Sequence, residues 1–377
     1  MKRALLISVQ GIGNIVLMTP AIRLLAAAGN EIDLIVSDNG SHETLRANPY
    51  IKRTYLWKER DGWLKNVLRL RSKLQVIKYE TAYALYPNGR RENTLLFLAR
   101  ASRKTCYVDR KYYYRLLGFL PFTEKIEFEK HHDVISNINL VATDRSKSSI
   151  AEPEVSLLED AEEVAQRFYK SHDLNDTFVV SVHPGGGNSA KRWGEENYLA
   201  LCEQLARNHK VKLLIFGSDS EAHFVNKIAK ALGDDAFPIC GLNIRHVSAL
   251  VRRSQLVIAN DSSLIHIASA FDIPVVAIWG YTDFHRTAPF STKALLIRID
   301  YPCSPCYEFG AGYIEDCKYH LKCIRNISSE RVYLIVALYI SLLTNNGCLD
   351  ARLIEQGSGV KSVKRIEGGC LMVNVSA

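Results

Sequence analysis

The sequence lacks any apolar run long enough to cross a lipid bilayer. The longest apolar stretch late in the chain, Val332 to Leu343, covers about twelve residues, whereas a membrane-spanning helix needs ~20. At the start, only about six apolar residues precede Gln10, fewer than the ~7–15 that form the core of a signal peptide. The sequence therefore predicts neither a transmembrane helix nor an export signal.

Fixed-period repeats, low-complexity tracts and the G-x-x-x-x-G-K-[ST] spacing of a Walker loop are also missing. Without an export signal, the nine cysteines are expected to stay reduced, so disulfides are not expected to hold the fold together. Four of them have the spacing C-x2-C-x10-C-x5-C, namely Cys303, Cys306, Cys317 and Cys323. Only the first pair has zinc-ligand spacing, so a structural metal and a cluster of packed thiols both remain open.

The composition is that of a globular protein: 377 residues, of which 47% are hydrophobic and 23% charged, enough for two domains. The net charge of +8 is unevenly distributed, because residues 1–150 hold 25 Lys or Arg against 14 Asp or Glu, while the remainder holds 23 against 26. A basic face can attract an anionic membrane surface, an acidic glycolipid or nucleic acid. Charge alone does not choose among them.

Two cationic and aromatic segments account for much of this excess, Lys52 to Lys78 and Arg100 to Arg115. The second places six cations and one anion among four tyrosines. Each segment can be an ordinary solvated surface or a binding surface for an anionic acceptor. Neither matches a recognised nucleic-acid-binding module, so nucleic acid is not an expected partner.

Apolar runs and helical patterns alternate along the chain as a parallel sheet requires. We predict an α/β fold of two doubly wound domains facing across a cleft, with the first covering residues 1–160 and the second residues 161–345. Residues 346–377 contain five glycines and are predicted to form a peripheral tail. The predicted strands are Ala4–Val9, Glu31–Val36, Ala82–Tyr86, Phe178–Val182, Lys212–Phe216, Leu256–Ala259 and Pro274–Trp279.

The sequence ANDSSLIHIASAFDIPVVAIWG predicts a strand, a polar turn, a helix and a second strand. Asp261 lies in the turn, and Ser262, Ser263 and Leu264 lie at the start of the helix. A helix N-terminus at the carboxyl edge of a parallel sheet offers unpaired N–H groups to a phosphate. The alternative is that Asp261 only caps the helix and that His266 packs one turn further along.

Three consecutive glycines follow a predicted strand in the sequence FVVSVHPGGGNSAKRW. The backbone N–H groups of Gly185, Gly186 and Gly187 can face phosphate oxygens, and Lys191 can neutralise them, which suits a departing diphosphate. The alternative is a flexible turn with surface cations. It is less attractive because Trp193 is a costly residue to leave in a loose loop.

Two shorter motifs give weaker signals. Near the start, GIGN places Gly11, Gly13 and Asn14 in a turn that lets the backbone approach a ligand, although glycine turns also end ordinary strands. Further on, FGSDSEA places Glu221 just after a predicted strand. That carboxylate can accept both hydroxyls of a ribose or can simply lie in the first turn of a helix.

Taken together, these motifs resemble glycosyltransferase family 9, the ADP-heptose:lipopolysaccharide heptosyltransferases and their relatives. GIGNIVLMTPAIRLL, HPGGGNSAKRW, FGSDSEA and ANDSSLIHIASAFDIPVVAIWG occur in the order and spacing of that family, from about residue 4 to 340. The resemblance implies a GT-B fold of two Rossmann-like domains, with the acceptor bound mainly by the first and the nucleotide sugar by the second. It also implies that no metal or other cofactor is needed.

The resemblance further implies a role for individual residues. Lys191 would contact the donor diphosphate and Glu221 the ribose, while His266 would face the same site. The implied catalytic residues are Asn14, Lys191 and Asp261, and the implied acceptor-binding residues are Gly11, Gly13 and Asn14. The implied donor-binding residues are Gly185, Gly186, Gly187, Lys191, Glu221, Asp261, Ser262, Ser263, Leu264 and His266.

Three positions depart from the family pattern. Asn14 stands where the family usually has an Asp thought to remove the acceptor proton, and an amide cannot do this, although it can position the hydroxyl. Ser263 replaces a glycine, and Gly194 replaces a proline after the tryptophan. The nucleotide site is expected to be intact, while the sugar and the level of activity are open.

We therefore expect an inverting glycosyltransferase that moves a heptose-like sugar from an ADP-heptose-like donor to a lipopolysaccharide, glycolipid or surface-polysaccharide acceptor. The expected location is the cytoplasm, with peripheral contact between the basic surface and the inner membrane leaflet. One rival is a GT-B epimerase or phosphorylase. Another is a nucleotide-sugar-binding protein in which Asn14 has weakened catalysis.

Overall fold

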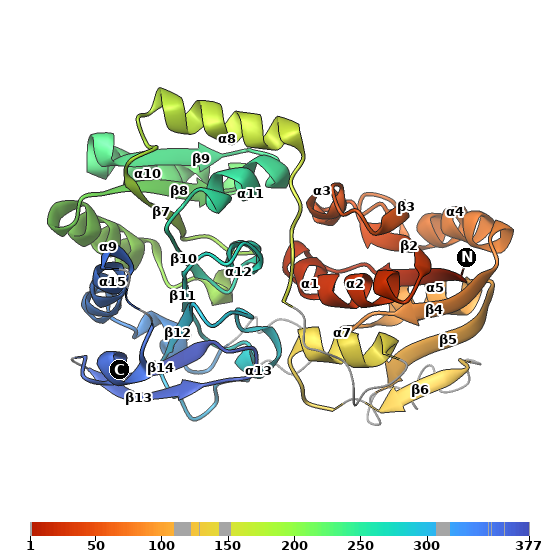
Figure 1. The fold of residues 1–377 in the computed structure, drawn as a ribbon. Coiled ribbons are helices and arrows are strands. Elements are labelled where there is room, and N and C mark those ends of the chain that lie inside the picture. Colours follow the sequence, from red (N-terminus) through yellow and green to blue (C-terminus); the bar gives the residue numbers. More distant parts are fainter. Residues whose placement is uncertain are drawn as a thin grey trace. The chain divides into compact units, whose positions relative to one another are not determined.

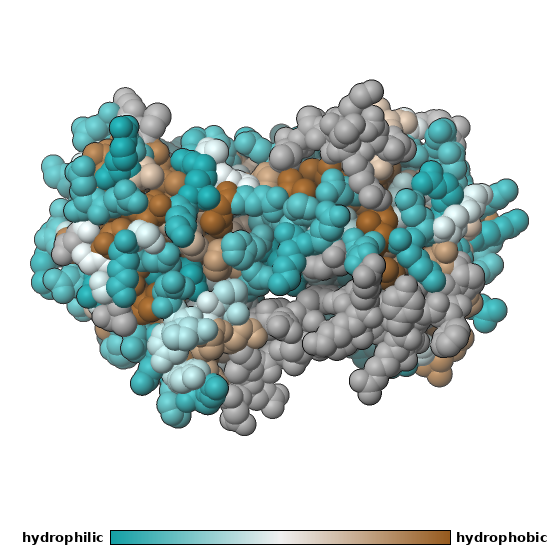
Figure 2. Space-filling model, turned by 90° about the horizontal axis from the view of Figure 1, so that it is seen from below, coloured by the Kyte–Doolittle hydropathy of each residue, from teal (hydrophilic) through white to brown (hydrophobic). Residues whose placement is uncertain are grey.

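The computed structural model describes residues 2–108, 122–127, 129–142, 152–306, 317–345, 347, 349–357 and 359–376. The chain divides into two compact units, Met1–Ser156 and Leu157–Ala377, each built on its own sheet (Figure 1). None of the described helices is both long and apolar enough to span a membrane. On the face drawn in Figure 2, hydrophilic residues supply most of the coloured surface.

The first unit is a six-stranded parallel sheet with the strand order β3-β2-β1-β4-β5-β6. From β1 the chain adds β2 and then β3 on one side, and afterwards adds β4, β5 and β6 on the other. The strand order therefore reverses between β1 and β4, and sheets of this kind bind ligands at such a reversal. The strands are β1 (Lys2–Ser8), β2 (Asn30–Ser37), β3 (Ile51–Trp57), β4 (Tyr79–Ala84), β5 (Ala101–Val108) and β6 (Glu124–Glu127). The helices are α1 (Ile12–Leu17), α2 (Thr19–Ala27), α3 (Ser41–Leu45), α4 (Trp63–Val76), α5 (Arg90–Leu98) and α7 (Asp133–Val141).

Strand β1 is apolar from Ala4 to Ile7, where both of its faces are buried. Leu5 and Ile7 pack with residues of α4 and α5, while Ala4 and Leu6 pack with residues of α2 and α7 on the other face. This alternation is the period of two that a strand imposes. After β1 the chain forms two successive helices, α1 and α2, and Pro20 lies in the first turn of α2, where its missing N–H costs no helical bond.

The second unit is an eight-stranded sheet with the order β13-β14-β12-β11-β10-β7-β8-β9. Here the strand order reverses between β7 and β10, so the ligand edge lies at their carboxyl ends. The first six strands are β7 (Phe178–His183), β8 (Val211–Gly217), β9 (Ala236–Cys240), β10 (Leu256–Asn260), β11 (Val275–Ile278) and β12 (Ala294–Arg298). The α-helices are α8 (Glu159–Ser171), α9 (Glu195–Asn208), α10 (Ala222–Leu232), α11 (Ile244–Arg252), α12 (Ser263–Ala270), α13 (Phe284–Thr287), α14 (Lys322–Arg325), α15 (Ser329–Thr344) and α16 (Ala351–Glu355). The predicted domain boundary at residue 160 falls within α8.

The end of the chain differs from the predicted peripheral tail. After α16, the strands β13 (Val360–Arg365) and β14 (Leu371–Val375) form an antiparallel pair, and β14 continues the sheet in parallel beside β12. Cys370 and Val373 are fully buried. The five glycines suggested a loose segment, but the apolar run that starts at Cys370 supplies enough buried surface to extend the sheet.

Candidate functional site

The glycine loop and the turn before α12 meet at the carboxyl edge of the second sheet. Strand β7 ends at His183 beside Ala259 of β10, so the chain segments that leave these two strands start next to each other. Across this junction, the Lys191 ammonium lies 2.6 Å from the Asp261 carboxylate; the Asp261 side chain is buried and that of Lys191 is half-buried. Two motifs that are 70 residues apart therefore contribute one ion pair at about the position where the sequence predicts a diphosphate.

The N-terminus of α12 is not capped by a side chain. The hydroxyl of its N-cap residue, Ser262, instead lies 2.9 Å from His183 Nδ1. The first N–H groups of an α-helix have no partner inside the helix, so those of Ser263 and Leu264 keep their hydrogen-bonding capacity. Because Asp261 directly precedes this turn, a cation and a row of N–H donors converge on one place that suits an oxyanion.

Glu221 lies inside the protein, bonded to the glycine loop. It accepts a hydrogen bond from the Gly186 N–H at 3.0 Å, and from the N–H and hydroxyl of Ser218 at 2.9 and 2.8 Å. Arg192 donates to it at 3.1 Å. Burial alone would raise the pKa of Glu221, but the interaction with His183 and the hydrogen bonds from Ser218 and Gly186 hold that pKa well below its ordinary value. Contact with a ribose stays a prediction, and the structure adds a second role, which is to hold the glycine loop.

The three glycines of this loop differ in what surrounds them. A Cβ on Gly185 would lie 2.2 Å from Glu221 Oε1, so any side chain there would displace the carboxylate. A Cβ on Gly187 would meet nothing within 4 Å. Gly185 is therefore needed for contact with Glu221, and Gly187 is the position that a ligand can approach.

Asn260 is a positioning residue that the sequence reasoning missed. Its fully buried amide donates to the carbonyl groups of Pro184 and Gly185, both at 2.8 Å. Its oxygen accepts from the Trp193 N–H at 3.1 Å and from the Tyr198 hydroxyl at 3.0 Å. One side chain thus fixes both ends of the glycine loop. An amide directly before Asp261, at the end of a buried strand, was the available signal.

Gly194 also has a structural explanation. Its φ of +119° lies in a region that side chains rarely adopt, and a proline, whose φ is fixed near −65°, cannot take it. Just before it, the Trp193 ring is fully buried and donates from Nε1 to the carbonyl of Ile327 at 2.7 Å. The loop is thus anchored firmly, which excludes the flexible-turn alternative for this segment.

His266 lies on α12, buried and near the ion pair. Burial lowers its pKa to about 4; the Asp261 charge opposes this shift and the Lys191 charge adds to it. Its Nδ1 has no hydrogen-bond partner among the described residues. His266 is therefore neutral at physiological pH and supports the first turn of α12 without adding charge.

This shift predicts that stability depends on pH. Between pH 6.5 and about 4, the unfolded chain binds a proton at His266 that the folded chain does not. The free energy of unfolding should therefore fall by up to about 1.4 kcal/mol per pH unit as the pH drops through this window. Urea denaturation of the His266→Gln variant between pH 6.5 and 5 should show a shallower fall. His223→Gln, which removes an exposed histidine from α10, is the control, and an equal change in both variants would contradict burial as the cause.

In the first unit, Asn14 lies in the first turn of α1, beyond the carboxyl end of β1. Its side chain is half-buried and makes no hydrogen bond to another described residue. The preceding turn is held by Glu92, which accepts from the Val9 N–H at 3.0 Å and the Gln10 amide at 2.8 Å. The other oxygen of Glu92 accepts from the Gly89 N–H at 2.9 Å. Glu92 is thus a structural carboxylate rather than a free proton acceptor.

The remaining sequence predictions have mixed outcomes. Burial raises the pKa of Cys306, and raises that of Cys323 to about 12; in both cases the Cys303 and Cys317 thiols reinforce the shift. No group of three or more His, Cys, Asp or Glu side chains suited to a metal occurs among the described residues. Of the segment 100–115, residues up to 108 include strand β5, and the rest lies outside the described residues.

Comparison with known proteins agrees with these motifs. The chain is similar to lipooligosaccharide heptosyltransferase 2 of Campylobacter jejuni (28% identity, covering 42% of this chain and 50% of that protein). It is also similar to lipopolysaccharide heptosyltransferase 2 of Salmonella typhimurium (32% identity, covering 32% of this chain and 36% of that protein). The chain thus spans half or less of the length of these relatives.

Solved structures match over more of the chain. A family 9 glycosyltransferase from Veillonella parvula has a TM-score of 0.76 at 20% identity, covering 91% of this chain and 98% of that one. The ADP-heptose lipopolysaccharide heptosyltransferase II of E. coli has a TM-score of 0.69 at 21% identity, covering 92% and 99%. These likenesses show the GT-B fold of two Rossmann-like domains. The model of glycosyltransferase family 9 (heptosyltransferase) matches residues 67–313, well over half of the sequence. The chain belongs to glycosyltransferase family 9.

Proposed function

We propose that the chain is an inverting glycosyltransferase that moves a heptose-like sugar from an ADP-heptose-like donor to an anionic acceptor of the lipopolysaccharide type. Family membership supports the reaction class, and the similarity to lipopolysaccharide and lipooligosaccharide heptosyltransferases supports the donor and the acceptor. The observation that carries the proposal is the Lys191–Asp261 pair beside the uncapped N-terminus of α12.

These groups suit the departure of a diphosphate. An acceptor oxygen forms a bond to the anomeric carbon, and the bond between that carbon and the donor phosphate breaks, with its electron pair leaving on the diphosphate. The Lys191 ammonium and the N–H groups of Ser263 and Leu264 stabilise the added charge where it develops. Asp261 holds the ammonium in place. The acceptor proton passes to a phosphate oxygen of the donor or to a carboxylate, because Asn14 cannot take it.

A second candidate is a nucleotide-sugar-binding protein without transfer activity. Asn14 favours it, since the residue at the position of the expected base is an amide whose side chain is not otherwise engaged among the described residues. The donor site would be the same in both cases, so only a transfer assay separates them.

We also propose that the protein works at the inner membrane leaflet from the cytoplasmic side. The excess of 25 cationic over 14 acidic side chains in residues 1–150 supports attraction to anionic lipid headgroups. Such attraction weakens as the ionic strength rises.

Thermal unfolding with a panel of nucleotides tests the donor site. A ligand at ~100 times its Kd adds about 2.7 kcal/mol to the stability of the folded state, so ADP and ADP-heptose should raise the melting temperature by several degrees. UDP-sugars at the same concentration serve as the comparison. If no nucleoside diphosphate stabilises the protein, the donor site is wrong. If ADP-heptose stabilises but no acceptor receives sugar, the binding-only candidate is correct.

A further inference from the structure

One outer face of the first unit exposes large apolar side chains. Within the described part of this unit, every large hydrophobic side chain that is strongly exposed lies on α4 or α5. These side chains are Trp63, Leu64, Leu68 and Val76 of α4, with exposed fractions of 39%, 62%, 56% and 79%, and Phe97 of α5, with 42%. We call this surface the α4–α5 face. Large exposed apolar patches that polar residues surround mark sites of interaction with proteins or membranes.

Helix α4 has two different sides. Val67, Leu70 and Leu74 are buried in the core of the unit. At about 100° per residue, Leu64, Leu68 and Gln75 share another side, and the Gln75 amide donates to the Leu98 carbonyl of α5 at 2.7 Å. The two exposed leucines therefore lie on the side of α4 that is next to α5. This side is separate from the buried stripe that packs α4 against the sheet.

Cations border these apolar side chains. Helix α4 contains Lys65, Arg69, Arg71 and Lys73 and no acidic residue. Lys65 is paired with Asp61, and the Lys73 ammonium lies 5.7 Å from the centre of the Tyr55 ring of β3, but Arg71 forms no ion pair with another described residue. The Arg90 guanidinium of α5 lies 5.1 Å from the centre of the Trp63 ring.

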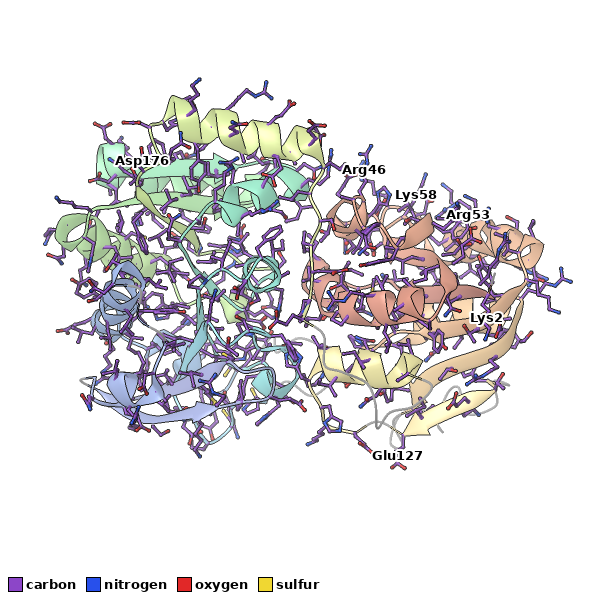
Figure 3. The ribbon with its side chains drawn as sticks, in the orientation of Figure 1. Lys2, Arg46, Arg53, Lys58, Glu127 and Asp176 are labelled. Carbon is purple, nitrogen blue, oxygen red and sulfur yellow. The ribbon has the colours of Figure 1, made fainter. Side chains whose placement is uncertain are left out.

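Further cations lie nearby on β3 and on the loop that follows it. Figure 3 shows Arg53 and Lys58 directed outward from this part of the unit. Arg53 is paired with Asp33, and the loop also holds Glu59 and Asp61, but cations outnumber anions around the α4–α5 face, which makes its surroundings net cationic.

We infer that the α4–α5 face docks on the surface of an anionic lipid bilayer. Trp63, Leu64 and Leu68 enter the boundary between headgroups and acyl chains, while Arg71 and Arg90 contact lipid phosphates. A second copy of the chain does not fit this face, because the cations of α4 would meet one another. The inference rests on the function proposed above, which assigns a lipid-linked acceptor, and it names the surface that contacts the membrane.

The tryptophans provide a direct readout. Of the four tryptophans in the chain, Trp57, Trp193 and Trp279 are buried to 2% exposure or less, and only Trp63 is exposed. Adding vesicles of phosphatidylglycerol and phosphatidylethanolamine to the full chain should shift the tryptophan emission to shorter wavelength, and vesicles of phosphatidylcholine should not. The shift should be lost in Trp63→Phe, because the other three rings stay inside the protein.

Sedimentation with the same vesicles measures affinity. We expect Leu64→Ser combined with Leu68→Ser to weaken binding about 10-fold or more, and Arg71→Glu combined with Arg90→Glu to weaken it and to reduce its salt dependence. The matched control is Leu334→Ser with Leu353→Ser, two similarly exposed leucines of the second unit (42% and 40%), which should bind as the unaltered chain does.

Three outcomes would overturn the inference: absence of binding to anionic vesicles, an equal loss in the control pair, or self-association in the absence of lipid that the Leu64 and Leu68 replacements abolish. The last outcome would make the face an interface between copies. Stabilisation by ADP, measured without vesicles, tests the donor site separately, so that either proposal can fail alone.

Discussion

Replacing Lys191 with methionine should lower the rate of sugar transfer by about 10²–10³-fold, the usual cost of losing one preorganised group that stabilises transition-state charge. The ammonium is held 2.6 Å from Asp261, beside the uncapped first turn of α12, so it needs no rearrangement when the diphosphate departs. The loss should appear mainly in kcat, because the added charge develops only as the bond breaks. Steady-state kinetics with ADP-heptose and an acceptor would measure it.

Lys212→Met is the matched control for this variant. Lys212 forms an ion pair of similar length, 2.8 Å, with Asp235, but it lies at the amino end of β8, away from the carboxyl edge that carries the site. Its removal should leave the transfer rate unchanged. The Lys191→Met variant also leaves Asp261 buried without its cation, so Lys191→Met combined with Asp261→Asn separates instability from catalysis. A transfer rate within threefold of normal in Lys191→Met would contradict the assigned role.

Replacing Asn14 with aspartate should raise the transfer rate by about 10²-fold, the lower end of what a positioned general base contributes. The side chain lies in the first turn of α1, close to the end of β1 where the first sheet changes strand order. A carboxylate there is compatible with the helix, because negative charge is favourable near a helix N-terminus. The variant should also gain an ascending limb in its profile of rate against pH.

Asn14→Ala completes this series. If the native amide positions the acceptor hydroxyl, the alanine variant should be slower than the native chain, so that the rates fall in the order Asp, Asn, Ala. Equal rates for Asp and Asn would show that another group already takes the proton. Transfer by the Asp variant alone would identify the native chain as a binding protein that has lost its base.

The parts of the fold that could be predicted are those in which the local pattern and the buried surface agree. Strand β10 and helix α12 follow directly from an apolar run, a polar turn and helical spacing, and the structure places them where predicted. The β13–β14 pair was missed because β13 is mostly polar and both strands are short. Its position depends on β12, whose residues pair with residues of β14 that lie 76 positions later in the chain, as Leu295 does with Leu371.

The same limit applies to the donor site. The sequence motifs identify Lys191 and Asp261, but neither motif alone shows that the two side chains form an ion pair. That contact depends on the parallel pairing of β7 with β10. Asn260 and Glu92 were missed for the same reason. Each is a polar residue whose partners come from loops distant in sequence, and only the folded sheet brings them together.

The antiparallel pair at the end of the chain has a further consequence for solubility. With β14 beside it, β12 becomes an interior strand, and the open border of the sheet passes to β13. That strand, VKSVKR, carries exposed lysine and arginine at Lys361, Lys364 and Arg365. Charged side chains on an edge strand oppose the pairing of that strand with a β-strand of another molecule. The final residues therefore protect the sheet that carries the proposed donor site against aggregation.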